Sequence, residues 1–593
     1  MTEQGRYEQL YRIGVELSAE KDRHRLVERI LLAAKDFSRA DGGTLYLVDE
    51  TAAELRFVLV RTDSLGLAYG GAGYPAPPMP SVPLFRADGI PNMSNVVSRC
   101  FHEKASVNIP DAYAGEGYDF SGTKVFDRHT GYRSKSFLTI PMRNAEQRVI
   151  GVLQLINAIS ASGEVVPFAL EIQEAVEALA FQAAIALDNQ MLLHQQKQLL
   201  ESFIKLIAAA IDAKSPHTGG HCRRVPALTE MLTEAACKET EGTLQDFNLN
   251  EDQWYELHIA SWLHDCGKIT TPVHIMEKST KLETISDRIH VVLSRLAMLR
   301  EEAQRRAAEA RVAGESPRDI EAQLRRRLAE LEDVADFINR VNVGSEQMAD
   351  ADVERIHQLA QWRWTDVHGV SIPLLSEDEV ENLTVRKGTL TERERLEING
   401  HMVETIRMLE ALPFPPHLKN VPEYAGGHHE RMDGNGYPKG LFAGDMSVPA
   451  RAMAIADVFE ALTASDRPYK AGMPLSRAMN IMAEMKRNHH LDPELFDVFI
   501  RSKVYLKYAR YYLMPEQIDE VDEDALLRCQ PPPYELPSLE ERLDRWEGFR
   551  PEYAAVARAA RYDVDIPSRR SVRTGENQSD ASNEFELRVF FGD

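Results

Sequence analysis

The sequence predicts a multidomain protein in which an α+β domain with an antiparallel sheet is joined by a long helix to an all-helical domain. Three observations lead to this prediction. Helical and strand-like patterns alternate over residues 1–190, a helical stripe continues over 191–207, and residues 208–505 are mostly helical in pattern and rich in histidine. With 593 residues, the chain is long enough to form several domains of ordinary size.

The first region begins with a helical pattern over residues 6–37 and closes with a helix that starts near Phe168. Between these helices, a loop rich in glycine and proline covers 65–83. The strand-like runs are Thr44–Val48, Leu55–Val60, a run that ends near Pro110, and the hairpin pair Ser136–Met142 and Val149–Asn157. This order of helix, strands and helix favours an α+β domain.

The closing helix continues through 191–207 as a connecting helix. Its apolar positions recur at a loose helical spacing and are Phe181, Ile185, Leu192, Leu199, Phe203 and Ile207. Such a stripe fits a helix that packs on its own domain. It also fits a signalling helix that dimerises and links two domains, which is the interpretation we favour. The sequence therefore predicts a homodimer.

A distinct segment at about 283–386 interrupts the second domain. Two amphipathic patterns flank a turn at Gly314–Pro317, which predicts a protruding helical hairpin. The run Arg325–Arg327 lies beside glutamates, so we interpret it as a solvated helix face and not as a nucleic-acid site.

The extension over 506–593 has a weaker pattern than the domain before it. It contains polar, turn-rich stretches, so we expect it to be partly disordered. A late strand is predicted at Phe585–Phe591.

The composition excludes several classes of protein. The formal net charge is −23, which argues against a partner that is a nucleic-acid polymer but allows a local site for a small anion. The five cysteines are scattered without CxxC spacing, which indicates a reducing compartment and no zinc-thiolate site. The N-terminus lacks a signal-peptide pattern, and no apolar run approaches about 18 residues. We therefore expect a cytoplasmic protein without membrane insertion.

Histidine and aspartate residues concentrate in short stretches of the second domain, where two doublets are hard to explain by packing alone. The candidate metal ligands are His221, His264, Asp265, His401, His428, His429 and Asp457. Imidazole and carboxylate suit divalent iron, manganese or zinc, and a set without thiolate favours an open site over a closed structural one. Asp265, which we place on one helix with His264, could bridge two metals, and such a pair clamps a phosphoryl group.

Two motifs in these stretches resemble those of the HD-GYP family, a branch of the HD phosphohydrolase superfamily. HHERMDGNGYP at 428–438 matches the family pattern HHExxDGxGYP at every specified position, HDCGK at 264–268 matches HDxGK, and DRPYK follows at 466–470. The resemblance covers about 208–282 and 387–505. It implies an all-helical domain that hydrolyses the bacterial second messenger cyclic di-GMP to pGpG or GMP with two or three divalent metal ions, iron or manganese.

Carried over position by position, the resemblance assigns the candidate ligands above to metals and counts His264, Asp265 and Lys268 as catalytic. Lys268 would bind the scissile phosphate, because it is expected on the same helical side as His264. Glu430 is a candidate to orient ligand histidines. The implied substrate-binding residues are Lys268, Arg467, Lys470, Gly436, Tyr437 and Pro438. The glycines and proline would shape a tight loop that contacts substrate or a protein partner.

The chain departs from the family pattern in two places. Asp212 stands where many members have glutamate, so a third metal at this position depends on a shorter side chain. The insertion separates TKLET near 280 from RKGTLTERERLEINGH at 386–401, and these pieces look like the two sides of one normal connection. The inserted hairpin could wall the site, bind a protein partner or extend a dimer.

The first region resembles a GAF domain, especially those of cyclic-nucleotide phosphodiesterases. The resemblance rests on DAYAGEGYDFSGTKVFDRHTGYRSKSFLTIPMRN at 111–144 and RVIGVLQLINA at 148–158. Asn157 matches the start of a nucleotide-binding motif, but Ala158 replaces its lysine. The interior is either core only or a pocket for a small ligand. The candidate rim residues of such a pocket are Asp111, Phe126, Asp127 and Thr130.

These interpretations lead to a cyclic di-GMP phosphodiesterase whose activity is regulated by its GAF domain. Two alternatives use the same residues. One is a signalling scaffold that binds a cyclic dinucleotide without turnover, and the other is a phosphohydrolase for another nucleotide, such as a hybrid cyclic dinucleotide.

Overall fold

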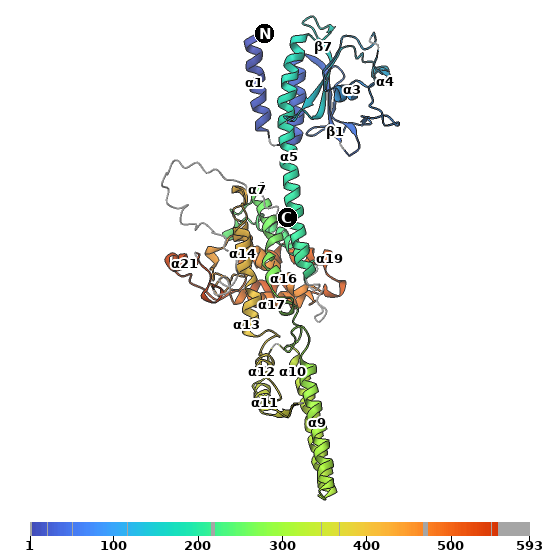
Figure 1. The fold of residues 1–593 in the computed structure, drawn as a ribbon. Helices are drawn as coiled ribbons and strands as arrows, with labels where there is room; N and C mark the ends of the chain where they lie inside the picture. The colour runs from blue at the N-terminus through green and yellow to red at the C-terminus, as the bar shows by residue number, and fades with distance from the viewer. Residues whose placement is uncertain are drawn as a thin grey trace, which may run out of the picture. The chain divides into compact units, whose positions relative to one another are not determined.

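The chain folds into two compact units, Met1–Leu200 and Glu201–Asp593, and each is described by itself. Figure 1 shows both. The computed structural model describes residues 3–20, 22–49, 51–114, 117–214, 220–345, 347–366, 368–465, 472–546 and 548–554. The predicted strand at Phe585–Phe591 lies outside the described residues.

The first unit is built on one antiparallel sheet with the strand order β3-β2-β1-β7-β6-β5, in which β4 pairs with β2 and β8 pairs with β7. Its strands are β1 (Ala40–Asp49), β2 (Glu54–Thr62), β3 (Leu67–Tyr69), β4 (Val82–Pro83), β5 (Val107–Ile109), β6 (Phe137–Arg143), β7 (Val149–Ile159) and β8 (Val165–Val166). The five predicted strand runs fall on β1, β2, β5, β6 and β7, while β3 and β4 lie in the predicted loop.

Helices cover both faces of this sheet. They are α1 (Glu3–Ala19), α2 (Arg23–Ser38), α3 (Val96–Glu103), α4 (Ser121–Thr130) and the first part of α5 (Leu170–Lys214). Leu31 of α2 and Leu187 of α5 belong to one apolar core, and Val97 of α3 belongs to a second core. The α+β prediction is confirmed, although the expected single first helix is broken, because Asp22 caps the start of α2 by accepting two backbone N–H groups.

Helix α5 has 45 residues and includes the whole predicted connecting segment 191–207. Leu192, Leu199 and Phe203 on this helix are exposed. The apolar stripe therefore remains available to a partner helix, and the homodimer stays a prediction. Among the described residues, none of the helices combines the length and the apolarity that crossing a membrane requires.

The second unit packs helices around α16 (Val448–Thr463), which contacts α6 (His221–Ala236), α15 (Val421–Gly426) and α17 (Leu475–Arg487). Its other helices, outside the insertion, are α7 (Glu251–Leu263), α8 (Val273–Met276), α13 (Glu392–Asn399), α14 (His401–Glu410), α18 (Pro493–Arg501), α19 (Val504–Tyr512), α20 (Glu523–Arg528) and α21 (Leu539–Trp546). Short 3-10 turns are η2 (Gly242–Leu244), η3 (Cys266–Thr270), η4 (Pro416–Leu418), η5 (Ala443–Asp445) and η6 (Pro515–Gln517).

The inserted segment has its own apolar core. Its elements are α9 (Ile289–Val312), α10 (Pro317–Asn342), α11 (Asp350–Ala360), β9 (Arg363–Thr365), β10 (Ser371–Pro373) and α12 (Glu377–Leu383). Helices α9 and α10 run side by side as the predicted hairpin (Figure 1). The hairpin is accompanied by two further helices, α11 and α12, and by a two-stranded ribbon, which the sequence patterns did not indicate.

The two ends of the insertion meet at its base. The hydroxyl of Thr389 donates to the carbonyl oxygen of Lys278 at 3.0 Å. The buried ammonium of Lys278 donates to the carboxylate of Glu394 at 2.7 and 2.8 Å. The structure therefore brings together the two sequence segments that looked like one connection.

Candidate metal centre

The predicted ligands converge from three helices and two inter-helical segments of the second unit. They form two groups in which the ligand atoms of each group lie within 4.8 Å of one another. The first group is His221, His264, Asp265 and Asp457, and the second is Asp265, His401, His428 and His429. His221 begins α6, His401 begins α14, and Asp457 lies within α16. Asp265 belongs to both groups.

The two oxygens of the Asp265 carboxylate face different groups. Oδ2 lies 3.2 Å from Nε2 of both His221 and His264. Oδ1 lies 3.2 Å from Nε2 of His401 and 4.0 Å from Nε2 of His428. A carboxylate placed in this way has the geometry of a ligand that bridges two metal ions.

Backbone carbonyls fix the orientation of three histidine rings. Nδ1 of His264 donates to the carbonyl of Ser261 at 2.8 Å, and Nδ1 of His428 donates to that of Ala425 at 2.7 Å. Nδ1 of His401 bonds the carbonyl of Ile398 in the same way. Because a carbonyl only accepts, each Nδ1 carries the proton and each Nε2 presents a lone pair to the centre.

The centre contains buried polar atoms without hydrogen-bond partners from the described chain. They are Nε2 of His221, His264, His401 and His428, and Oδ1 of Asp265. Buried polar atoms in proteins normally have partners, so a convergent set without them fits a group that metal ions would complete. The donor set therefore fits two divalent cations.

A glycine allows the catalytic segment to approach α14 closely. A Cβ at Gly267 would lie 2.0 Å from the carbonyl oxygen of His401, and the Gly267 N–H donates to the hydroxyl of Thr405 at 2.9 Å. This contact brings Asp265 close to the first turn of α14, where His401 lies.

The expectation that His264, Asp265 and Lys268 share one helix is wrong. Helix α7 ends at Leu263, and the 3-10 turn η3 begins at Cys266, so Asp265 lies at the junction. The break allows adjacent side chains to reach the same centre, which a continuous helix would direct about 100° apart.

Burial and charge set the protonation of the ligands. Burial lowers the pKa of His428 to about 4 and holds that of His429 well below its ordinary value, so both rings are neutral at neutral pH. Burial opposes ionisation of Asp457, but the ring of His221, whose Nε2 lies 3.3 Å from Oδ1 of Asp457, keeps the pKa of this carboxyl below its ordinary value. Neutral imidazole and ionised carboxylate are the forms that bind metal.

Lys268 lies at the edge of the centre, with its ammonium 2.5 Å from Oδ2 of Asp265 and its side chain 21% exposed. Burial disfavours its charge, yet the carboxylates of Asp265 and Asp457 raise its pKa above the ordinary value. Cys266 is next to this site, but burial raises the pKa of its thiol to about 12, so it does not offer a thiolate.

Glu430 contacts backbone amides and no ligand histidine. Its carboxylate accepts N–H groups of Lys439, Gly440 and Leu441 at 2.7 to 3.2 Å, which holds the loop after Pro438. Burial raises the pKa of this carboxylate to about 7.

The carboxylate that contacts a ligand is Glu460, which accepts from Nδ1 of His221 and pairs with Arg224. Sequence reasoning did not single out Glu460. Its position three residues after Asp457 on the same helix was the available signal, because residues at i and i+3 lie on one face.

The ring of Tyr437 lies against a predicted ligand. It is nearly parallel to the ring of His429, with ring centroids 4.9 Å apart and an interplanar angle of 15°. Its other neighbour is Tyr553, whose ring centroid lies 5.6 Å away at 21°. The ring faces of Tyr437 are therefore occupied, which leaves its edge and hydroxyl for any contact with substrate.

Three further predicted residues are not seen among the candidate metal ligands. The carboxylate of Asp212 accepts the N–H of Gly220 at 3.1 Å and belongs to neither ligand group. Arg467 and Lys470 lie outside the described residues.

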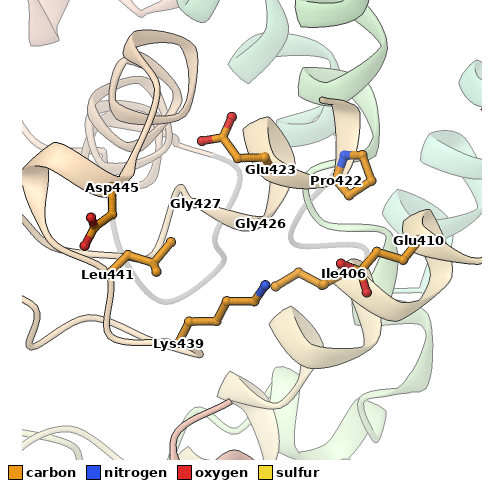
Figure 2. A pocket seen from close by; sticks show the side chains of 9 residues that line it. All are labelled: Ile406, Glu410, Pro422, Glu423, Gly426, Gly427, Lys439, Leu441 and Asp445. Atoms are coloured by element: carbon orange, nitrogen blue, oxygen red, sulfur yellow. The ribbon is translucent and has the colours of Figure 1, made fainter. Parts of the chain in front are cut away.

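A small cavity lies beside the histidine doublet but not in the metal centre (Figure 2). Its volume is about 50 Å³, and Gly426 and Gly427, just before the doublet, line it together with Lys439. Ligand pockets usually enclose about 300–1,000 Å³, so this cavity is too small for a dinucleotide.

In the first unit, two predicted functional residues make structural hydrogen bonds. The buried Asp127 accepts from the hydroxyl of Tyr113 at 2.6 Å and from the N–H and hydroxyl of Ser134 at 2.9 and 2.7 Å. Asn157 accepts the N–H of Lys135 at 2.7 Å and donates to a backbone carbonyl at 2.9 Å. These contacts hold the segment before β6 in place.

Comparison with protein-family models defines the two domains. A model described as GAF domain matches residues 22–187, and a model described as HD domain matches residues 370–495. The HD match includes His401, the histidine doublet and Asp457, whereas His221 and Asp265 precede it. The chain thus combines an N-terminal GAF domain with an HD domain.

The curated relatives match short parts of the chain. The chain is 42% identical over 122 residues to 3′3′-cGAMP-specific phosphodiesterase 1 of Vibrio cholerae, covering 21% of this chain and 27% of the relative. It is 48% identical over 75 residues to a cyclic di-GMP phosphodiesterase of Pseudomonas aeruginosa, covering 13% and 17%. The chain thus spans about a quarter or less of these relatives. The matches confirm the resemblance to the HD-GYP and GAF families.

A solved GAF domain from an Acinetobacter phosphoenolpyruvate-protein phosphotransferase also matches the chain. The match covers 33% of this chain and 99% of that one, at 17% identity and a TM-score of 0.24.

Proposed function

We propose that this protein is a metal-dependent phosphodiesterase that hydrolyses cyclic di-GMP to pGpG or GMP. The observation that supports this most directly is Asp265, a buried carboxylate whose two oxygens face two groups of ligand atoms. Relatives of the chain include enzymes named cyclic di-GMP phosphodiesterases.

In this proposal, the two ligand groups each hold one divalent ion and share Asp265. When bound, such ions activate water and neutralise charge on a phosphoryl group. Iron or manganese suits these nitrogen and oxygen donors. The chain fixes the ring orientations through carbonyls and through Glu460, so the site needs little rearrangement to bind.

Lys268 is the group we propose for the scissile phosphate. Its ammonium is charged, partly exposed and adjacent to the shared carboxylate, so it can reach a non-bridging oxygen without leaving the centre. Arg467 and Lys470 are proposed to hold a further phosphate or guanine. Gly436, Tyr437 and Pro438 are proposed to form the adjoining wall, and a third metal at Asp212 remains a separate prediction.

A second candidate substrate is 3′3′-cGAMP. Two relatives, 42% and 36% identical over their matched segments, are named 3′3′-cGAMP-specific phosphodiesterases 1 and 3 of Vibrio cholerae. Both substrates present the same phosphodiester bonds to the centre, so the distinction depends on recognition of one base. A scaffold without turnover is the third candidate, although the described chain retains every predicted central ligand.

Regulation by the GAF domain through α5, in a homodimer, completes the proposal. Helix α5 runs without interruption from the GAF fold to the residues before α6 and leaves an apolar stripe exposed. A ligand of the GAF domain would regulate hydrolysis only if it bound one state of the protein more tightly than another.

The test is hydrolysis of the two cyclic dinucleotides side by side. The full chain would be purified anaerobically with manganese or iron, and products would be resolved by chromatography beside His264→Ala and Asp265→Ala. Loss of product in both variants supports the metal phosphodiesterase, and the ratio of the two rates identifies the substrate. Bound metal with intact nucleotide and no product would support the scaffold.

A further inference from the structure

The C-terminal segment, residues 548–554, contacts the loop that carries the motif residues 436–438. The backbone N–H of Arg550 donates to the carbonyl of Pro438 at 2.9 Å, and its guanidinium donates to the carbonyl of Gly436 at 3.0 Å. Arg550 therefore holds the loop through two hydrogen bonds, one on each side of Tyr437.

Tyr553 adds an aromatic contact with Tyr437, the residue between Gly436 and Pro438. It is 7% exposed and packs with Val403 of α14. Its hydroxyl accepts the side-chain amide of Asn399 at 3.2 Å, which ties the segment to the end of α13. Its ring lies nearly parallel to that of Tyr437, which in turn lies nearly parallel to that of His429.

The preceding residues of the extension attach to the same region. The hydroxyl of Tyr534 donates to the carbonyl of Asp433 at 3.2 Å, and the guanidinium of Arg542 pairs with Asp445 at 2.6 Å. The extension therefore contacts both sides of the loop over 433–445. The contacting residues of the extension lie far from HHERMDGNGYP in sequence. Neither this motif nor HDCGK assigns a role to residues after 506.

We propose that Arg550 and Tyr553 are positioning residues of the phosphodiesterase site, a proposal that rests on the proposed function. They hold Tyr437 flat against His429 and thereby fix the wall of the site. Truncating Tyr553 removes one face of the three-ring stack and releases Tyr437 to rotate away from the ligand. The rings of His264, His401 and His428 are expected to stay in place, because backbone carbonyls orient them.

The test uses the full chain loaded with manganese and the variants Tyr553→Ala, Tyr553→Phe and Tyr553→Leu. Tyr511→Ala is the matched control, because Tyr511 is 82% exposed on α19. We expect Tyr553→Ala to lower kcat by about threefold to tenfold, as for loss of an aromatic pair. Metal content should stay unchanged, and Tyr553→Phe should restore the rate.

A second readout does not depend on the substrate. Hydrogen exchange at the amides of Tyr437 and of residues 439–441 should be faster in Tyr553→Ala than in Tyr553→Phe or Tyr511→Ala. If Tyr553→Ala does not fold, the same two measurements are made on Tyr553→Leu, which keeps the apolar volume of the side chain and tests the positioning role in its place. Unchanged exchange together with unchanged kcat would overturn the proposal. If the unaltered chain hydrolyses neither dinucleotide, the proposed function fails, while the exchange measurement still tests the positioning role.

Discussion

The GAF and HD units use buried polar side chains in opposite ways. In the GAF unit, the carboxylate of Asp127 is surrounded by three donors from Tyr113 and Ser134. In the HD unit, Oδ1 of Asp265 and the Nε2 atoms that face it have no hydrogen-bond partner among the described residues. Both aspartates are buried, so burial alone does not distinguish them.

In this comparison, incomplete hydrogen bonding marks the carboxylate that is predicted to bind metal. A polar group that satisfies its own fold contributes to stability, whereas convergent groups without partners await a ligand. Substitution should therefore affect stability in the GAF unit and metal binding in the HD unit. Four predictions test this difference, in order of decreasing effect.

Asp265→Asn should abolish metal binding at both groups and lower hydrolysis by at least about a thousandfold, because the bridging charge is lost. Metal content measured by elemental analysis and product formation measured by chromatography check this. Asp246→Asn, which removes the charge of an exposed aspartate in the same unit, is the control. Two metal ions retained in Asp265→Asn would contradict the bridging role.

Gly267→Ala should destabilise the HD unit by about 3 kcal/mol and reduce metal content, because the new methyl group would overlap the His401 carbonyl. Gly122→Ala in the GAF unit is the matched control, since a Cβ there meets no atom within 4 Å. Thermal unfolding of both variants gives the comparison. Equal stability of the two would mean that the approach of η3 to α14 is not tight.

Glu460→Gln should weaken metal affinity by about tenfold to a hundredfold, because the side chain that orients His221 loses its charge. Competition with a chelator of known affinity measures the change. Glu309→Gln, on the exposed surface of α9, serves as the control. Unchanged affinity would show that Glu460 supports only the helix packing.

Asp127→Ala should lower the free energy of unfolding of the GAF unit by about 1–3 kcal/mol and leave metal content unchanged. The substitution leaves the donors of Ser134 without their acceptor in a buried position. Denaturant unfolding followed beside metal analysis checks both parts. If Asp127→Ala lost metal but kept its free energy of unfolding, the contrast between the GAF and HD units would be contradicted.

The sequence was sufficient for features that depend on local pattern. Alternating apolar residues located β1, β2, β6 and β7, and helical periodicity located α9 and α10. The two doublets that contain histidine, His264–Asp265 and His428–His429, were conspicuous because each lies in a short apolar context. The spatial convergence of all seven candidate ligands agrees with the expected centre.

Features that depend on distant contacts could not be found in this way. Glu460 meets His221 across 239 positions of sequence, and Arg550 meets Gly436 across 114. The 3-10 turn between His264 and Lys268 could not be predicted from the sequence for a different reason. Its residues fit a helical pattern, but the close approach of Gly267 to α14 favours a tighter 3-10 turn.

The base of the insertion has a consequence for engineering and for the history of the chain. Because Thr389 meets Lys278 at 3.0 Å, the intervening hundred or so residues leave and re-enter the HD fold at nearly one point. A short turn could replace them without moving α13 or α14. We therefore expect the insertion to be removable as a module, and we expect the same position to accept a reporter domain that folds independently of the metal centre.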